Sequence, residues 1–255
     1  MLKSRVIPCL LIQDGELVKT LKFSDPKYVG DPINTIRIFN DKEVDELIVL
    51  DISASRKSRE PDYALIESFS SECFMPLCYG GGIKSVKQAN LIFKLGIEKI
   101  CLQTAALNDP AIISYIADKF GSQSVVVSVD VKKDRKGKYK IYRSMDGKII
   151  EQPWLQYLKE IVQAGTGEVI LNSVDHDGTM AGMDLEMIRE AASEVPVPLI
   201  ALGGVGNLFD IKKAIEVGAS AVSAGSFFVF QGPYRAVLIT YPEHLELEGL
   251  LGKKE

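Results

Sequence analysis

The sequence lacks the features that define membrane, secreted and nucleic-acid-binding proteins. No apolar run approaches the ~20 residues of a membrane-spanning helix. The opening "MLKSRVIPCLL" has basic residues before a short apolar run but no small-residue cleavage site, so we expect a first strand and not a signal peptide. The net charge of −4 gives no electrostatic attraction to nucleic acid or to an anionic membrane. We therefore expect neither as a partner.

Cysteine and histidine are also scarce, with four and two residues respectively. The cysteines show no metal-ligand spacing, and we expect neither a metal nor a cofactor. Cys9, Cys78 and Cys101 lie in apolar, strand-like runs, which predicts buried thiols in a reducing compartment. The expected location is therefore cytoplasmic.

What the chain does contain is an alternation of short apolar runs with segments of helical period. This pattern is typical of a parallel sheet that is buried on both faces. Eight apolar runs favour an α/β protein of the closed (β/α)8 TIM-barrel type, and 255 residues fit one such domain, spanning 1–255. The eight runs are 5–12, 46–51, 76–79, 98–103, 124–130, 168–172, 198–202 and 220–225. After strand five, the alternation around Asp146-Gly147 predicts an inserted β-hairpin.

An internal repeat divides the predicted barrel into two halves. The segment "PLCYGGGI" at 76–83 returns as "PLIALGGV" at 198–205, which is an offset of 122 residues (198 − 76). The same offset relates Glu46 to Glu168 and Thr104 to Ser226. We therefore predict half-barrels over about 1–122 and 123–230, followed by an atypical tail over 231–255.

The repeat also predicts a ligand site. The pairs Gly81-Gly82 and Gly203-Gly204 follow strands three and seven, and glycine lets backbone amides approach a ligand closely. In barrels, the loops after strands seven and eight often bind phosphate. The twofold repeat therefore favours two phosphate sites on opposite sides of the mouth and a ligand with a phosphate at each end. The alternative is that the glycine pairs only form tight turns.

Several motifs resemble the HisF family, the cyclase subunit of imidazole glycerol phosphate synthase. They are "DELIVLDISAS", "YGGGI", "TAAL", "FGSQSVVVSVD", "LNSVDHDGTMAGMD" and "GGVG", in order, within residues 1 to about 230. The resemblance implies a (β/α)8 barrel that works with a glutaminase subunit, HisH. It also implies that ammonia enters the barrel bottom and crosses the core. At the top face the cyclase condenses it with a bis-phosphorylated ribulosyl intermediate.

The resemblance implies roles for individual residues. Asp130 matches one of two catalytic aspartates, a carboxylate suited to proton transfer. The ammonia gate at the barrel bottom would be formed by Arg5, Glu46, Lys99 and Glu168, whose alternative role is a structural plug. Glu98 and Gln123 match the glutaminase contact. The phosphate and substrate positions are Lys19, on the loop after strand one, with Gly82, Thr104, Gly178, Gly204, Gly225 and Ser226.

Three further acids, Asp51, Asp175 and Asp177, follow strands two and six and are secondary site candidates by position alone. Two departures from the family pattern are more informative. Leu11 stands where the family has its other catalytic aspartate, and Asp14 lies three residues later in a turn. In the tail, the family's final amphipathic helix is not evident, and the prolines at 233 and 242 bracket a β-like run, "AVLITY".

This combination resembles a HisF-like branch that is associated with amidation of bacterial surface sugars. Such a protein would pair with a HisH-like glutaminase and deliver ammonia to an ATP-dependent amidotransferase, which forms an acetamidino sugar. Two other hypotheses remain open. One is a working cyclase of histidine biosynthesis, with Asp14 or a water in place of the missing acid. The other is a noncatalytic scaffold that binds and activates its glutaminase.

Overall fold

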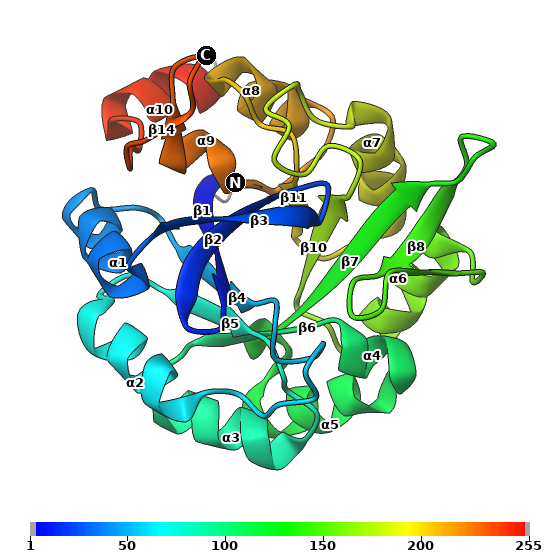
Figure 1. Ribbon diagram of the computed structural model, residues 1–255. Coiled ribbons are helices and arrows are strands. Elements are labelled where there is room, and N and C mark those ends of the chain that lie inside the picture. The colour runs from blue at the N-terminus through cyan, green and yellow to red at the C-terminus, as the bar shows by residue number, and fades with distance from the viewer. Residues whose placement is uncertain (1–3, 253–255) are drawn as a thin grey trace.

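Eight parallel strands close into a barrel in the computed structural model, which describes residues 4–252. The sheet order runs from β10 through β11, β12, β1, β4, β5 and β6 to β7, and β7 pairs with β10 to close the ring (Figure 1). These strands are β1 (Arg5–Gln13), β4 (Leu47–Asp51), β5 (Leu77–Gly80), β6 (Lys99–Leu102), β7 (Val125–Lys133), β10 (Glu168–Ser173), β11 (Leu199–Leu202) and β12 (Ala221–Ala224). The predicted TIM barrel is therefore confirmed.

Helices form the outer ring around these strands (Figure 1). Most of the long helices begin at a side chain that accepts a backbone N–H, as Asp31 does for α1 and Asn207 for α8, because the first turn has no internal partners. The helices are α1 (Pro32–Asp41), α2 (Tyr63–Glu72), α3 (Val86–Lys94), α4 (Thr104–Asn108), α5 (Ala111–Phe120), η1 (Ser122–Ser124), α6 (Trp154–Gln163), α7 (Leu185–Glu194), α8 (Leu208–Glu216), α9 (Ser226–Val229) and α10 (His244–Leu251).

Two antiparallel extensions lie at the carboxyl ends of the barrel strands. After β1, the chain turns at Asp14-Gly15 into β2 (Glu16–Leu21) and β3 (Ser24–Gly30), and β2 pairs with the upper half of β1. After β7, it continues into β8 (Tyr139–Arg143) and β9 (Lys148–Ile150), which pair antiparallel beside the end of β7. The prediction that Lys19 lies on a loop after strand one is thus wrong, because residues 16–21 pair antiparallel with the end of β1 and with β3.

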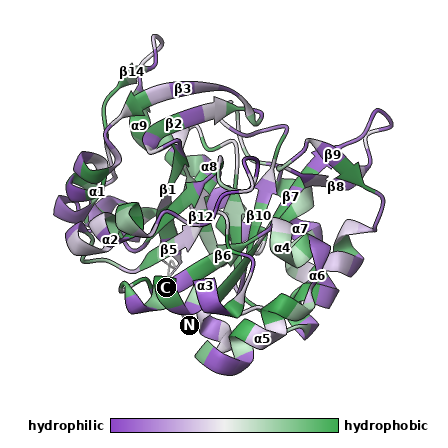
Figure 2. Cartoon of the chain, turned by 60° about the horizontal axis from the view of Figure 1, so that its bottom comes forward, coloured by the Kyte–Doolittle hydropathy of each residue, from purple (hydrophilic) through white to green (hydrophobic). Residues whose placement is uncertain are grey.

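The alternation of each strand divides its side chains between two apolar regions. On β7, Val125, Val127, Val129 and Val131 face the helices, whereas Val126, Ser128 and Asp130 face the barrel interior. Figure 2 shows the apolar colour concentrated on the barrel strands and the hydrophilic colour on the outer sides of the helices. The inward row of each strand can therefore carry polar groups without disturbing the packing of the helices.

The tail differs from its predicted form. Only Ala236–Val237 of the run "AVLITY" forms a strand, β14, which pairs with β13 (Phe230–Gln231). The chain then forms the helix α10, with Leu247 buried in the core beside α8. The β-like reading of the run and the missing final helix are thus wrong, because burial of this apolar side chain stabilises a helix that is weakly amphipathic. No helix in the described part of the chain has the length and apolar character needed to cross a bilayer.

Candidate functional site

The barrel interior carries a closed ring of charged side chains at the amino ends of the strands. Arg5 pairs with Glu46 and Glu168, and Lys99 pairs with the same two carboxylates, over N–O distances of 2.5 to 2.9 Å. Burial lowers the pKa of Lys99, but hydrogen bonds to and charge from both glutamates outweigh it and raise the pKa overall. The four residues predicted as a gate therefore lie together, and we call them the charged ring.

Above the charged ring, the barrel interior is apolar. Burial raises the pKa of the thiols there, that of Cys9 to about 11, so they stay protonated and uncharged at neutral pH. The interior is formed by Ile7, Cys9, Ile48, Cys78, Cys101, Val126, Ile170, Ile200, Leu202 and Ala221, with Leu11 and Leu50 packed against them. Among the described residues, this largely apolar column, in which the Ser223 hydroxyl donates to the Ile7 carbonyl oxygen, separates the charged ring from the opposite end of the barrel.

At that opposite end, the carboxyl ends of the strands surround a cavity of about 160 Å³, which we call the mouth. Gly204 shows why a glycine is required there. Its φ is +101°, and a β-carbon would lie 2.1 Å from the carbonyl oxygen of Gly182. All predicted phosphate and catalytic positions line the mouth: Leu11, Lys19, Gly82, Thr104, Asp130, Gly178, Gly204, Gly225 and Ser226. What they bind stays a prediction.

Lys19 lies on β2 and not on a loop, and its side chain is turned into the mouth. It is 4% exposed, donates to the carbonyl oxygen of Cys9, and lies so close to Gly225 that a β-carbon there would be 2.8 Å from its amine nitrogen. Burial lowers the pKa of Lys19, although the charge of Asp177 acts in the opposite direction. The Lys19 amine is therefore held beside the second glycine-rich side of the mouth, in surroundings that disfavour its charged form.

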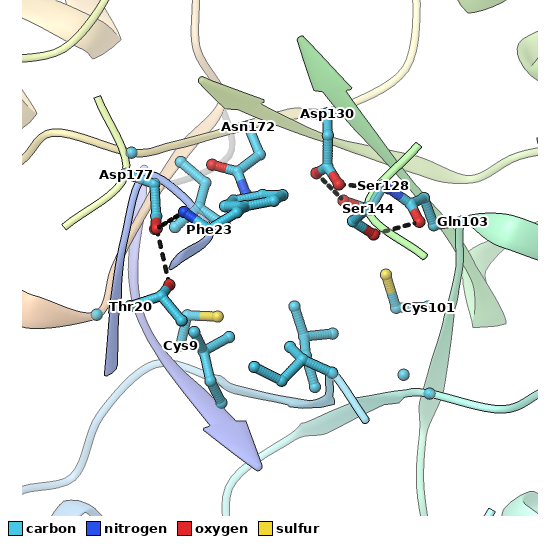
Figure 3. A pocket seen from close by; sticks show the side chains of 18 of the residues that line it. Cys9, Thr20, Phe23, Cys101, Gln103, Ser128, Asp130, Ser144, Asn172 and Asp177 are labelled. Carbon is cyan, nitrogen blue, oxygen red and sulfur yellow. Dashed lines mark hydrogen bonds between the residues drawn. The ribbon is translucent and has the colours of Figure 1, made fainter. Parts of the chain in front are cut away.

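Asp130 is the centre of a hydrogen-bond network that the sequence analysis missed (Figure 3). Its carboxylate accepts from the Gln103 amide and from Ser128 Oγ, and Ser144 Oγ donates to Gln103 Oε1 over 2.8 Å. Ser144 follows β8, so the network joins the hairpin to the mouth. Desolvation, aided by the charge of Asp177, raises the pKa of Asp130 to about 7. A carboxyl group with this pKa can both donate and accept a proton at neutral pH.

The secondary acids differ in position. Asp177 lines the mouth and accepts from Thr20 Oγ1 and the Phe23 amide, which ties β2 and β3 to the loop after β10 (Figure 3). Its pKa is raised by burial, and these hydrogen bonds partly offset the increase. Asp51 also lines the mouth, and it accepts from the amides of residues 53 and 54. Asp175 is not among the residues that line the mouth, and its carboxylate instead accepts from the backbone of Lys133.

Leu11 lines the mouth beside Leu50, its partner on β4. Asp14 does not line the cavity, because its carboxylate is turned to the surface, where it pairs with Lys57 and Arg59 at 2.6 and 3.0 Å. It therefore cannot stand in for an acid at position 11 in this arrangement. Asp130, 5% exposed, is the most buried of the three carboxyl groups that line the mouth among the described residues, and position 11 is occupied by a leucine.

The predicted glutaminase contacts, Glu98 and Gln123, are exposed; Glu98 directly precedes β6, and Gln123 lies in η1, just before β7. Glu98 accepts from the amide of Leu77, the first residue of β5. Both residues therefore lie at the end of the barrel that holds the charged ring. Their contact with a partner stays a prediction. In residues 4–252, no three His, Cys, Asp or Glu side chains gather in a way that could hold a metal ion.

The closed parallel barrel defines this chain as a TIM-barrel protein, and its glycine-rich mouth is a cavity at the carboxyl ends of the strands. The chain belongs to the histidine biosynthesis protein family, whose model matches residues 5–234.

Relatives resemble the chain over nearly its full length. A Pseudomonas aeruginosa protein, provisionally named imidazole glycerol phosphate synthase subunit hisF2, is 52% identical over 97% of this chain and 99% of its own length. A Leptospira interrogans protein, provisionally named as the HisF subunit, is 49% identical over 98% and 99% respectively. The imidazole glycerol phosphate synthase subunit HisF of Chlorobaculum tepidum is 40% identical over 91% and 92%. The resemblance to HisF is confirmed, whereas the sugar-amidation branch stays a prediction.

Proposed function

We propose that this chain is the ammonia-channelling barrel subunit of a glutamine-dependent amidotransferase that pairs with a HisH-like glutaminase. The nitrogen acceptor is proposed to be an ATP-dependent sugar amidotransferase that forms an acetamidino sugar for surface polysaccharide. The observation that carries the proposal is Leu11, which lines the mouth where a two-carboxylate cyclase needs an acid. Leucine can neither donate nor accept a proton, so ring closure by two carboxyl groups is not available.

The inward face of β1 supports a conduit. Arg5, Ile7, Cys9 and Leu11 alternate along the strand and face inward, from the charged ring through the apolar column to the mouth. Neutral ammonia crosses an apolar region more readily than ammonium, because burial of an unpaired charge is strongly unfavourable. A charge-balanced ring at the entrance and an uncharged column above it therefore suit a path for ammonia.

A second candidate, the cyclase of histidine biosynthesis, is favoured by a different observation. Asp130, Lys19 and both glycine pairs still line the mouth, and Asp130 has a pKa of about 7. The printed names of the HisF relatives point the same way. One carboxyl group with this pKa could catalyse a reaction that needs a single proton transfer.

A cyclase assay with ammonium salt and the ribulosyl bisphosphate substrate separates the two candidates. We expect this chain to turn over the substrate at least about a hundredfold more slowly than an ordinary HisF protein does. The reason is that a general acid or base typically accelerates a reaction by ~10²–10⁴-fold. We expect Leu11→Asp to restore part of that activity. Leu50→Asp is the matched control, because it places a carboxylate on the neighbouring strand, and it should restore none. Wild-type turnover within about tenfold of an ordinary HisF protein would overturn the proposal.

The conduit is tested in a reconstituted system of this chain, a HisH-like glutaminase and the sugar amidotransferase. Arg5→Met and Lys99→Met should impair product formation from glutamine but not from added ammonium, because only the glutamine route crosses the charged ring. Arg37→Met removes an ion pair with Glu72 on the outer helices and is the control. Equal yields from both nitrogen sources in all variants would contradict the conduit. Stimulated glutaminase without nitrogen transfer would instead indicate a scaffold.

A further inference from the structure

Two basic side chains line the mouth. The charged residues among its described lining are Lys19 and Arg56, with the carboxylates of Asp51, Asp130 and Asp177. Lys19 lies beside Gly225, as described above. Arg56 lies on the opposite glycine-rich side, in the loop between β4 and α2, and has no role so far. We propose that Arg56 is a specificity-determining residue that binds the second phosphate of a bis-phosphorylated ligand.

Arg56 lacks the ion pair that its neighbours have. Within residues 4–252, none of its nitrogens lies within ion-pair distance of a carboxylate, whereas Lys57 and Arg59 both pair with Asp14. Its Nε donates to the carbonyl oxygen of Ser144 over 3.2 Å. This bond orients the guanidinium and leaves the two terminal NH₂ groups, the pair that binds phosphate in a bidentate manner, for a ligand.

The backbone that carries Arg56 is held in place. The amides of Lys57 and Arg59 donate to the carbonyl oxygens of Ser53 and Ala54 over 2.9 and 2.8 Å. The loop also packs on the first glycine pair, because a β-carbon on Gly82 would lie 3.1 Å from that of Ala54. Arg56 is therefore positioned by a fixed loop beside the predicted phosphate position, and little conformational entropy is lost when it binds.

The internal repeat also relates Arg56 to a position that lines the mouth. It lies 122 residues before Gly178 (178 − 56), which is the offset that relates the two half-barrels, and both residues line the mouth. Gly178 packs against β2, the strand that carries Lys19, since a β-carbon on it would lie 2.1 Å from the Thr20 carbonyl oxygen. Each half of the mouth therefore has one basic side chain at its glycine-rich loops, supplied by β2 in one half and by Arg56 in the other.

An independent observation indicates that the mouth binds a ligand with hydrogen-bond donors. Asn172 lines the cavity and is 6% exposed, and its Oδ1 has no hydrogen-bond partner in the described structure. Buried polar atoms nearly always have a partner. This oxygen lies by Gly203, whose β-carbon would be 3.2 Å away, so a hydroxyl group of a ligand on the glycine loops can donate to it. A small polyol with a phosphate at each end can bind Lys19 and Arg56 with its phosphates and donate a hydroxyl hydrogen bond to Asn172.

This inference goes beyond the proposed function, because it concerns the ligand of the mouth and not nitrogen transfer. The test measures calorimetric binding of ribulose bisphosphate and ribulose monophosphate to the full chain, without partner proteins. We expect the wild type to bind the bisphosphate at least about tenfold more tightly, since a charge-assisted hydrogen bond contributes ~1.5–3 kcal/mol. Arg56→Met should abolish this preference. Its affinity for the monophosphate should stay within about twofold of the wild-type value, because the phosphate position beside Lys19 is unchanged.

Two variants complete the test. Arg56→Lys keeps the charge but loses the planar fork, so we expect it to retain part of the preference. Lys57→Met removes a neighbouring charge, while Arg59 continues to hold Asp14, and it should bind both ligands as the wild type does. Monophosphate binding shows that each variant has a folded mouth. The assignment would be overturned if the wild type bound both ligands equally tightly, or if Arg56→Met still preferred the bisphosphate. It would also be overturned if Arg56→Met lost the same amount of affinity for both ligands.

Discussion

Replacing Asp130 with asparagine tests the electrostatics of the mouth. The Asp130 side chain is 5% exposed, and its desolvation together with the charge of Asp177 raises its pKa to about 7. An aspartate in an unfolded chain has a pKa of about 3.9. Between these two values the folded protein holds a proton that the unfolded chain has released. Asparagine has a similar shape but cannot ionise, so it removes this difference.

The sign and size of the effect follow from linkage. The stabilising contribution of a group whose folded pKa is raised is fully present below the unfolded pKa and is lost as the pH rises through the folded pKa. For Asp130 this loss occurs from about pH 4 to about pH 7. A shift of about three units at ~1.4 kcal/mol per unit corresponds to roughly 4 kcal/mol. Relative to the wild type, D130N should therefore gain roughly 4 kcal/mol in free energy of unfolding over this interval.

The assay is urea unfolding at a series of pH values, followed by the fluorescence of Trp154, the single tryptophan, which is buried. The comparison of two proteins at each pH cancels the other titrating groups that they share. Asp14→Asn is the matched control, because Asp14 is exposed and its hydrogen bond and charge interaction with Lys57 lower its pKa. Because its pKa is lowered, its contribution changes only as the pH falls toward about 4 and below, so its curve should run parallel to that of the wild type from about pH 5 to about pH 7. A parallel curve for D130N would refute the argument that burial raises this pKa.

Three further substitutions test the charged ring, the mouth and the tail by the same unfolding measurement. Lys99→Met should destabilise the protein by ~2–4 kcal/mol, because it leaves a net negative ring with Glu46 only 3% exposed; an unchanged midpoint would show that the ring is well hydrated. Gly204→Ala should cost ~2 kcal/mol or more, since its β-carbon would meet the Gly182 carbonyl oxygen at 2.1 Å, and a smaller loss would mean that this loop yields easily. Tyr241→Phe removes a 2.8 Å hydrogen bond to the Val6 carbonyl oxygen and should cost ~1 kcal/mol; no loss would mean that the bond contributes nothing.

The barrel strands could be predicted from the sequence because they follow from the period of the strand, whereas the charged ring was implied by the resemblance to HisF. A buried parallel strand shows as a short apolar run, and a charged residue at its start, such as Arg5 or Lys99, faces the interior at the barrel bottom. The 122-residue repeat also recurs in the structure, where β5 and β11 begin at Leu77 and Leu199. Local patterns are sufficient for features of this kind.

Features that depend on contacts between distant segments could not be predicted in this way. Residues 16–30 show no regular alternation of buried and exposed positions, and the pairing of β2 with β1 and β3 places the Lys19 side chain in the mouth. Gln103, Ser144 and Asp130 come from three separate segments, and the position of the hairpin decides whether they meet. Likewise, α10 is stabilised by the packing of Leu247 and has little amphipathic pattern of its own. In each case tertiary contacts override or complete a weak local signal.

The position of Leu11 connects the proposed loss of one activity with the proposed gain of another. Its inward neighbours on β1 are Cys9 and Ile7, so a leucine there extends the apolar column by one further layer, up to the floor of the mouth. A carboxylate at the same place would attract a proton and hold ammonia as ammonium at the exit. Under the proposed function, the same substitution therefore removes a catalytic acid and keeps the path uncharged until the mouth. It follows that Leu11→Asp should raise cyclase turnover while it slows the delivery of glutamine-derived ammonia to a second enzyme. If both rates rose together, the leucine would have no part in the conduit.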